Sequence, residues 1–408
     1  MVISTLSHHI DLDWMHEAYA MTRKDGATGT DGQTAEQYAE RLDENLADLL
    51  ERIKKGLYRA PAVRRTCIPK GDGKSLRPLG IPTFEDKVAQ RAISMVLESV
   101  YEQDFLNCSY GFRPGRSAHQ ALDALRAALM EMKGGYVIEL DVRQYFDRVD
   151  HTRLQEVLGQ RISDGVIRRM VGKWLNAGVM ENGAIRKSAS GTPQGGVISP
   201  MLGNIYLHEV LDKWFEHDVL PRLAKRAALV RYADDAVIVC ADKQDAERIY
   251  AVLFKRFEKY GLELHPQKTR CTEMRRPPFG GTGQTTFDFL GFSHYWGKTK
   301  RGGNVIKLKT AKDRLRRTLK RVREWIETNF HTPIAVQHAA LSRKLQGHYA
   351  YFGVPCNRFA LEQVHEAVER MWMYWLNRRS RNRRSWRWFK SLKRRFQLPR
   401  PRLRLTTA

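Results

Sequence analysis

Two adjacent aspartates, Asp234 and Asp235, lie between two short apolar runs at residues 227–231 and 236–240. The runs are typical of β-strands, so the aspartates are predicted at the turn of a hairpin. Carboxylates placed side by side are costly unless a cation neutralises them, and a divalent metal ion is the expected cation. Aspartate also tolerates turn conformations, and the pair taken alone more often marks an ordinary turn. A metal site therefore requires a third carboxylate from elsewhere in the chain.

The third carboxylate is predicted to be Asp141, which directly follows the apolar run 136–140. An acid at this point can simply be a solvated strand end, but large aromatic residues follow it before the next acid, Asp147. Asp141 with the aspartate pair would form an open oxygen cluster of the kind that Mg²⁺ prefers, with Mn²⁺ as an alternative. Two such ions, about 3.5–4 Å apart, can activate a 3′-hydroxyl and stabilise a pyrophosphate leaving group. The predicted chemistry is phosphoryl transfer.

The elements that must position these carboxylates alternate irregularly between helix and strand. Apolar spacing predicts helices at 10–60 (with a glycine-rich break at 26–32), 86–101, 117–132, 151–175, 199–218 and 243–260, and extended segments at 61–82, 136–141, 227–240 and 262–310. From residue 312 to about 396 the pattern is helical, with a break at 353–355. This irregular order predicts an α+β fold rather than a doubly wound sheet.

The charge of the chain is concentrated at one end. The formal net charge is +25, and residues 301–408 hold 27 Lys and Arg against 6 Asp and Glu, a net charge of +21. Such a surplus suits a polyanion, through counterion release from phosphates. Tryptophans and Phe389 lie among the arginines, which favours RNA or single-stranded DNA with unstacked bases. The arginines expected to bind nucleic acid here are Arg378, Arg379, Arg381, Arg383, Arg384 and Arg387.

Cysteine usage and hydropathy exclude several other classes. The five cysteines include no Cys-x-x-Cys pair, so neither a disulfide framework nor a thiolate zinc site is expected. No apolar run approaches the roughly 18 residues of a membrane-spanning helix, and the first residues do not resemble a secretory signal. We expect a soluble cytosolic protein without a membrane partner.

Successive motifs along nearly the whole chain resemble those of reverse transcriptases, and specifically of proteins encoded by bacterial group II introns. The most specific string is Ser190-Gly-Thr-Pro-Gln-Gly-Gly-Val-Ile-Ser-Pro200, followed by Asn204-Ile-Tyr206. Others match in order: 26–32, 68–71 with 76–82, 109–119, 138–150, Tyr232-Ala-Asp-Asp235, 261–269 and 287–292. No endonuclease-type spacing of cysteines and histidines is present, so the chain resembles the compact type without an endonuclease.

The resemblance implies roles for the residues of the metal cluster. Asp141 and Asp234 would be the principal metal ligands, with the backbone carbonyl of Val142, and Asp235 would be a weaker third ligand. Phe146 falls at the position of an aromatic gate that would clash with a ribose 2′-hydroxyl and favour deoxynucleotides. Alternatively, Phe146 is a packed core residue.

Further residues would handle the nucleotide and the template. Lys70 and Arg77 would hold the triphosphate of the incoming dNTP, or be solvent-facing charges of a loop. Gln194 and Gly195 would lie close to the nascent base pair, and Lys268 would assist protonation of pyrophosphate. Arg113 and Arg116, in the motif at 109–119, are expected to contact nucleic acid.

The implied architecture is a right-hand polymerase with fingers and an antiparallel palm sheet, followed by an α-helical thumb or maturase domain and a basic tail. The expected segments are 1–135 (N-terminal extension and fingers), 136–300 (palm, with part of the fingers interleaved), 301–376 (thumb and maturase domain) and 377–408 (Arg-rich tail). The implied partners are group II intron RNA, an RNA template with a DNA primer, a DNA target and dNTPs. The protein would act as a monomer or a homodimer.

Three functions remain open from the sequence. The first is an RNA-directed DNA polymerase that also assists intron splicing and retrohoming as a maturase. The second is an RNA-binding splicing cofactor with incidental polymerase activity, although the intact carboxylate set speaks against it. The third is a domesticated relative in defence or DNA repair, which the DNA flanking the gene would distinguish. An RNA-dependent RNA polymerase is disfavoured by the aromatic residue at position 146.

Overall fold

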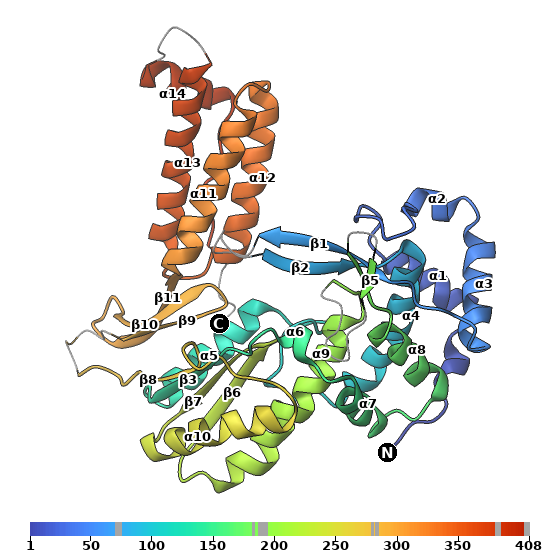
Figure 1. Ribbon diagram of the computed structural model, residues 1–408. Helices are drawn as coiled ribbons and strands as arrows, with labels where there is room; N and C mark the ends of the chain where they lie inside the picture. Colours follow the sequence, from blue (N-terminus) through green and yellow to red (C-terminus); the bar gives the residue numbers. More distant parts are fainter. Residues whose placement is uncertain are drawn as a thin grey trace. The chain divides into compact units, whose positions relative to one another are not determined.

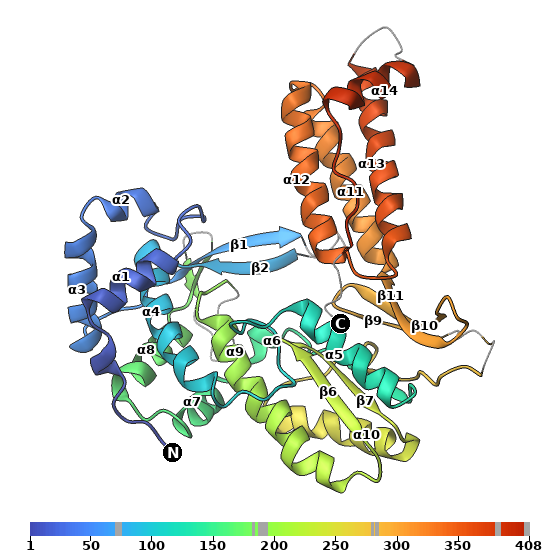
Figure 2. The same cartoon turned by 180° about the vertical axis from the view of Figure 1, so that it is seen from behind.

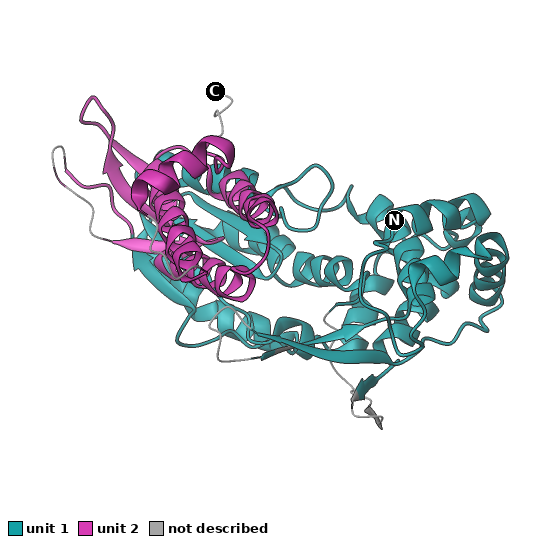
Figure 3. Ribbon diagram, turned by 90° about the horizontal axis from the view of Figure 1, so that it is seen from above, with its two compact units in different colours: residues 1–273 teal, residues 274–408 magenta. Residues whose placement is uncertain are grey.

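A computed structural model describes residues 1–69, 76–181, 184–186, 195–278, 281, 285–379 and 385–403. The chain divides into two compact units, Met1–Glu273 and Met274–Ala408 (Figure 3). The division leaves the strands of residues 286–310 in the second unit. The α+β composition expected from the sequence is confirmed, and none of the described helices is long and apolar enough to cross a membrane.

The first unit begins with helices that are capped by residues the sequence supplies. Its helices are η1 Ser7–His9, α1 Leu12–Met21, α2 Ala35–Ala39, α3 Leu42–Lys54, α4 Phe84–Tyr101, α5 Ala118–Glu131, α6 Tyr145–Arg148, α7 His151–Gly159, α8 Gly165–Leu175, α9 Ser199–Leu207 and α10 Lys243–Lys259 (Figure 1). Thr34 and Gln37 form a capping box at α2, and the Thr83 side chain accepts a hydrogen bond from the Asp86 amide at α4. α4 packs against α1 and α9 and contributes much of its length to the core.

Two sheets complete this unit. One has the order β2-β1-β4-β5, with strands β1 Val63–Pro69, β2 Leu76–Ile81, β4 Val179–Glu181 and β5 Ala184–Arg186. The other has the order β6-β7-β3-β8, with β3 Tyr136–Leu140, β6 Ala227–Tyr232, β7 Asp235–Cys240 and β8 Arg270–Glu273. All neighbours in the second sheet are antiparallel. Ile138 and Ile238 pair at its fully buried centre. The antiparallel pairing of β6 with β7, from Ala227 opposite Cys240 to Tyr232 opposite Asp235, confirms the predicted hairpin of residues 227–240.

The helix predicted over residues 199–218 is present but changes its winding. After α9, residues His208–Asp212 (η2) and Trp214–Val219 (η3) are π-helical, and Leu220–Arg222 (η4) ends the segment as a 3₁₀ turn. π-Helical turns are rare and frequently occur near functional sites. Here the π segment contains Asp212, which is fully buried beneath the β6–β7 hairpin.

The second unit combines a three-stranded sheet with a helical bundle. Its elements are β9 Thr286–Phe289, β10 Phe292–Lys298, β11 Asn304–Thr310, α11 Lys312–Asn329, α12 Ile334–Phe352, α13 Arg358–Arg378 and α14 Trp386–Arg395. The sheet order is β11-β10-β9, with antiparallel neighbours. The described helices confirm the helical prediction for most of the range 312–396, with the expected break near residues 353–355 and a further break at residues 330–333. Residues 380–384 of this range lie outside the described part of the chain.

The C-terminal segment belongs to the core of this bundle. Phe389 and Leu398 are buried in the same cluster as Trp372. The segment then follows α12, where the Gln397 carbonyl lies 3.0 Å from His338 Nε2 (Figure 2). Within the expected tail at 377–408, the described residues Phe389 and Leu398 therefore pack in the same core as the preceding helices.

Candidate active site

The three aspartates lie where the central strands of the sheet β6-β7-β3-β8 meet the turn, with Asp141 just after β3 and Asp234 and Asp235 at the start of β7. β3 pairs with β7 so that Leu140 lies opposite Ala236, and the next pair in this register is Asp141 with Asp235. Tyr232 pairs with Asp235, which leaves Ala233 and Asp234 as the turn. The side chain of Asp234 is half-buried and that of Asp235 is exposed. The register therefore brings to neighbouring backbone positions residues that lie more than 90 positions apart in the sequence.

A segment at 263–269 holds Asp141 in place from the other side. The His265 amide donates a 2.8 Å hydrogen bond to the Asp141 carbonyl, and the Asp141 amide donates a 3.3 Å bond to Thr269 Oγ1. Lys268 Nζ lies 3.3 Å from Asp141 Oδ2, and both side chains are substantially exposed. The predicted site residue Lys268 thus pairs directly with a predicted metal ligand.

The fit to a metal ion can be judged from the donors present. Among the residues that the structure describes, no three His, Cys, Asp or Glu side chains already form a group that could hold a metal ion. The carboxylate of Asp141 instead faces Lys268. The residue types at this site nevertheless have the right chemistry, because carboxylates supply the oxygen ligands that hard divalent cations require. A cation would replace the ammonium group of Lys268 at Asp141.

The backbone carbonyl of Val142 points away from the neighbouring segment that contains Leu264. Val142 forms an antiparallel bridge with Leu264, whose two hydrogen bonds use the Asp141 carbonyl and the Arg143 amide. Peptide groups alternate in direction along a strand, so the Val142 carbonyl points away from this pairing. Val142 itself is 9% exposed. Its carbonyl can therefore serve as a further oxygen ligand on the side opposite Leu264.

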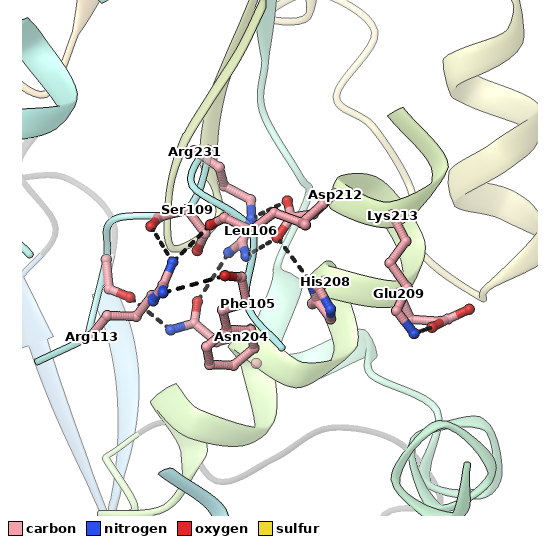
Figure 4. A network of polar contacts seen from close by, with 12 residues as sticks. Phe105, Leu106, Ser109, Arg113, Asn204, His208, Glu209, Asp212, Lys213 and Arg231 are labelled. Atoms are coloured by element: carbon pink, nitrogen blue, oxygen red, sulfur yellow. Dashed lines mark hydrogen bonds and ion pairs between the residues drawn. The ribbon is translucent and has the colours of Figure 1, made fainter. Parts of the chain in front are cut away.

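A buried polar network lies directly beneath the aspartate turn (Figure 4). The guanidinium of Arg231 donates from Nε to Asp212 Oδ1 at 2.7 Å and from Nη2 to Asp212 Oδ2. Its Nη1 donates to Asn204 Oδ1 and to the Ala233 carbonyl, both at 3.0 Å. Burial alone would raise the pKa of the Asp212 carboxyl, but the Arg231 charge and hydrogen bonds outweigh it and hold this pKa below its ordinary value. The pair is ionised at neutral pH.

The expected aromatic gate, Phe146, lies in α6 beside α9. Its ring packs edge-on against Tyr145, with the centroids 5.1 Å apart, and it is half-buried at the margin of the core. The Tyr145 hydroxyl donates a 2.7 Å hydrogen bond to the Gly203 carbonyl. A Cβ at Gly203 would lie 3.2 Å from the Tyr145 ring and 3.3 Å from the Phe146 ring. Gly203 thus provides the space in which both rings sit. Phe146 is partly packed, as one of the two alternatives expected, and its role as a gate stays a prediction.

The loop before α9 is described only at its end, where it meets two other elements. Gly195 has φ +113°, and a Cβ there would lie 2.7 Å from the Gly80 carbonyl of β2. The Ile198 amide donates to Gln90 Oε1 at 3.3 Å, and Gln90 Nε2 donates to the buried carboxyl of Asp86 at 3.1 Å. Gln194 and Lys70 lie outside the described residues, and of Arg77 only the backbone, paired with Ile68 in β1–β2, is described.

Arg113 does not have the role that the sequence suggested. Its side chain is only 3% exposed and forms an ion pair with Glu102. It also donates to the carbonyls of Leu106 and Ser109, both at 2.8 Å. These bonds occupy the guanidinium inside the protein, so the expectation that Arg113 contacts nucleic acid is wrong. Arg116 is half-buried, lies over the Tyr110 ring and donates to Asn107 at 2.8 Å.

The arginines near the C-terminus differ in exposure and partners. Arg378 and Arg387 are exposed, and Arg378 lies over the Tyr374 and Trp375 rings. Arg379 is also exposed, but it donates to the carbonyls of Thr332 and His331 at 2.9 and 3.2 Å. The other three arginines of this group, Arg381, Arg383 and Arg384, lie outside the described residues.

Comparison with known proteins decides the family. The profile of the family described as reverse transcriptase (RNA-dependent DNA polymerase) matches residues 68–294, which is more than half of the chain and contains all three aspartates. The chain belongs to the reverse transcriptase family. The antiparallel sheet with its Asp141 and Asp234-Asp235 edge is therefore the palm of a reverse transcriptase. Enzymes of this family generally use divalent metal ions.

The relatives include proteins associated with introns of Lactococcus lactis and of Schizosaccharomyces pombe. Protein YkfC of Escherichia coli is 37% identical over 258 residues, which cover 56% of this chain and 68% of YkfC. The group II intron-encoded protein LtrA of Lactococcus lactis is 43% identical over 182 residues, 44% of this chain and 29% of LtrA. An uncharacterised 91 kDa protein in a cob intron of Schizosaccharomyces pombe is 29% identical over 338 residues, 68% of this chain and 41% of that protein. The chain thus spans less than half the length of the latter two.

Sequence reasoning missed the buried residues beneath this reverse transcriptase turn. Asn204 belongs to the most specific motif string but received no role, and Arg231 and Asp212 received none either. Arg231 is a charged residue at the end of a β-run, and Asp212 lies 19 positions earlier in an apolar helix. A charged residue inside each of two predicted buried elements is the signal that would have suggested an ion pair.

Proposed function

We propose that this protein extends a DNA primer on an RNA template with dNTPs, using Asp141, Asp234 and Asp235 to hold two Mg²⁺ or Mn²⁺ ions. The observation that carries the proposal is the β3–β7 register, which places Asp141 beside the Asp234-Asp235 turn within the segment matched to the reverse transcriptase family. Bound ions there would activate the primer 3′-hydroxyl and stabilise the leaving pyrophosphate.

The residues of the chain would orient and select the nucleotide. Asp141 and the turn fix the carboxylates on a rigid sheet edge, which favours a reproducible position for the reacting groups. The Phe146 ring, supported by Tyr145 and Gly203, would exclude a 2′-hydroxyl by contact. Lys268, released from Asp141 by a metal ion, would be near enough to give a proton to the leaving pyrophosphate.

The direct test is dNTP incorporation on an RNA template with a DNA primer in Mg²⁺. Asp234→Asn keeps the size of the side chain and removes its charge, and we expect it to lower incorporation by at least a thousandfold. Asp123→Asn changes an exposed acid on α5 and serves as the matched control. Absence of incorporation by the unaltered protein, or equal incorporation by the protein and Asp234→Asn, would contradict the polymerase assignment.

We further propose that the second unit binds group II intron RNA and assists its splicing and retrohoming to a DNA target in the bacterial cytoplasm. Support comes from the similarity to LtrA and from the net charge of +21 in residues 301–408, with Arg378 and Arg387 exposed. The test uses RNA transcribed from the DNA that flanks the gene. Splicing of a group II intron from this RNA is measured with and without the protein. A flank without an intron ribozyme would instead favour a domesticated polymerase, and splicing by Asp234→Asn at the full rate would separate the two activities.

A further inference from the structure

We propose that Arg231 is a positioning residue for the catalytic turn, and that Asp212 and Asn204 hold it in that role. The inference rests on the proposed function of Asp234 as a metal ligand. Arg231 does not touch substrate, since it and Asp212 are both fully buried. It would act by fixing the backbone that presents Asp234.

Every nitrogen of the Arg231 guanidinium has a defined partner. Nε and Nη2 bind the two oxygens of Asp212 as a fork, which sets the plane of the guanidinium. The remaining nitrogen, Nη1, then points to Asn204 Oδ1 and the Ala233 carbonyl, each 3.0 Å away. Asp212 therefore determines where Nη1 lies, and Nη1 in turn determines where the Ala233 carbonyl lies.

The Ala233 carbonyl belongs to the peptide group that leads into Asp234. Ala233 has φ 57°, a left-handed conformation that an alanine adopts only where the surroundings impose it. A hydrogen bond to its carbonyl fixes the plane of the 233–234 peptide, and hence the direction of the Asp234 side chain. Without that bond, the strain at Ala233 favours relaxation of the turn away from the position in which its aspartates face Asp141.

The loop around Gly111 closes the turn from the other side. A Cβ at Gly111 would lie 2.4 Å from the Ala233 amide nitrogen, so the backbones are in close contact. Asn204 Nδ2 donates to the Gly111 carbonyl at 2.7 Å, while its Oδ1 accepts from Arg231. One amide side chain thus connects the loop and the guanidinium, and Figure 4 shows Asn204 beneath Arg231 in this arrangement.

Asn204 also links the turn to the residue that would select the sugar. The carbonyl of its neighbour Gly203 accepts a hydrogen bond from the Tyr145 hydroxyl, and the missing side chain of Gly203 leaves space for the Phe146 ring. Both supports are on α9, so a displacement of this helix would move the metal edge and the aromatic ring together. We therefore expect Asn204 variants to change metal dependence and deoxynucleotide selection in the same protein.

The test uses Arg231→Lys, which keeps the buried charge opposite Asp212. A single ammonium cannot serve Asp212, Asn204 and the Ala233 carbonyl in the fixed geometry of the fork. We expect the kcat of incorporation to fall at least tenfold and the Mg²⁺ concentration for half-maximal activity to rise at least threefold, with the KM for dNTP changed less than threefold. Arg161→Lys is the control, because it alters a bidentate pair with Asp104 in the same unit without contacting the turn; it should leave the Mg²⁺ dependence unchanged.

A second variant and a second measurement distinguish a positioning role of Arg231 from a failure of Arg231→Lys to fold. Asn204→Ala removes the link to Gly111 without leaving a buried charge unpaired, and it should show the same rise in Mg²⁺ requirement even where Arg231→Lys does not fold. Mn²⁺ binding, measured by electron paramagnetic resonance, reports the site without turnover. Weaker Mn²⁺ binding by the folded variants supports positioning, whereas unchanged Mn²⁺ binding and Mg²⁺ dependence overturn it. Mn²⁺ binding that Asp234→Asn does not weaken would contradict the proposed function itself.

Discussion

Lys268 Nζ lies 3.3 Å from Asp141 Oδ2, so a predicted metal ligand is paired with a cation of the protein itself. The side chain of Lys268 is 61% exposed and that of Asp141 is 37% exposed, and pairs this open to water contribute only about 0–1 kcal/mol. A metal ion can therefore displace the ammonium at small cost. The pair would keep the carboxylate in position between catalytic cycles.

Lys268→Met should affect metal affinity and turnover in opposite directions. Without its competitor, Asp141 should bind Mg²⁺ more tightly, by up to about fivefold for a pair of this strength. The kcat should fall if Lys268 gives a proton to pyrophosphate. Titrating incorporation against Mg²⁺ at saturating dNTP separates the two effects. A lower kcat with an unchanged Mg²⁺ requirement would show that the ion pair does not compete with metal.

Gly203→Ala tests whether α9 sets the position of the aromatic ring. The added Cβ would lie 3.2–3.3 Å from the rings of Tyr145 and Phe146, closer than ordinary contact, so the Phe146 ring must shift. If the ring is a gate, its displacement toward the nucleotide should raise the KM for dNTP, whereas Phe146→Ala should instead increase ribonucleotide incorporation at least tenfold. Competition between dNTP and rNTP on one primer measures both. Unchanged sugar discrimination in Phe146→Ala would leave the ring with a packing role only.

Asp86 should make the stability of the first unit depend on pH. Burial raises the pKa of its carboxyl from 3.8 to about 6, although Tyr58, Trp174 and Gln90 donate hydrogen bonds to it. Between these two values the folded protein keeps a proton that the unfolded chain releases. The contribution of Asp86 to stability should therefore be greatest below pH 4, decrease as the pH rises to about 6 and stay level above it. The full change is on the order of 3 kcal/mol, at about 1.4 kcal/mol per pH unit.

Asp86→Asn removes this titrating proton, so the free energy of unfolding should decrease less between pH 4 and 6. Urea titrations from pH 4 to 7, with hydrogen exchange of α4 amides as the readout, compare the two proteins. The variant also presents an amide nitrogen toward Gln90, the residue that accepts the Ile198 amide at the start of α9. The difference in slope between the proteins, rather than the absolute stability, is therefore the quantity to compare. Parallel curves would mean that Asp86 is not protonated in the folded state.

Local patterns predicted the hairpin and the position of the aspartates because both depend on short apolar runs in the sequence. These runs form β3, β6 and β7, and one register then brings Asp141 to the turn. The Arg231–Asp212 pair was not predictable in the same way, since its members lie on different elements and only the fold makes them neighbours. The π-helical winding of residues 208–219 left no periodic signal distinct from an α-helix.

Exposure was the other property that the sequence did not reveal. Arg113 lies in a basic, glycine-rich motif, and nothing in its neighbours distinguishes a phosphate contact from a buried pair with Glu102. The same limit applies to the C-terminal region, where the density of arginines concealed the apolar residues Phe389 and Leu398 that attach it to the bundle. Charge density predicted a polyanion as the partner, but it did not predict which arginine side chains are exposed.

The C-terminal arginines should differ in their contribution to RNA binding. Arg378 and Arg387 are exposed, and binding of a phosphate by either would release counterions. Replacing both with Gln should make the plot of log affinity against log salt less steep, by roughly one for each phosphate that the protein no longer neutralises. Arg379→Gln is the matched control, because its guanidinium is bonded to the carbonyls of His331 and Thr332 and should change the slope less. Filter binding of intron RNA between about 50 and 200 mM salt measures the slope for the unaltered protein, the double variant and Arg379→Gln.

Two outcomes would contradict this prediction. Equal slopes in the double variant and the unaltered protein would place the RNA-binding surface elsewhere in the second unit. An effect of Arg379→Gln as large as that of the double variant would show that exposure does not identify the arginines that bind RNA.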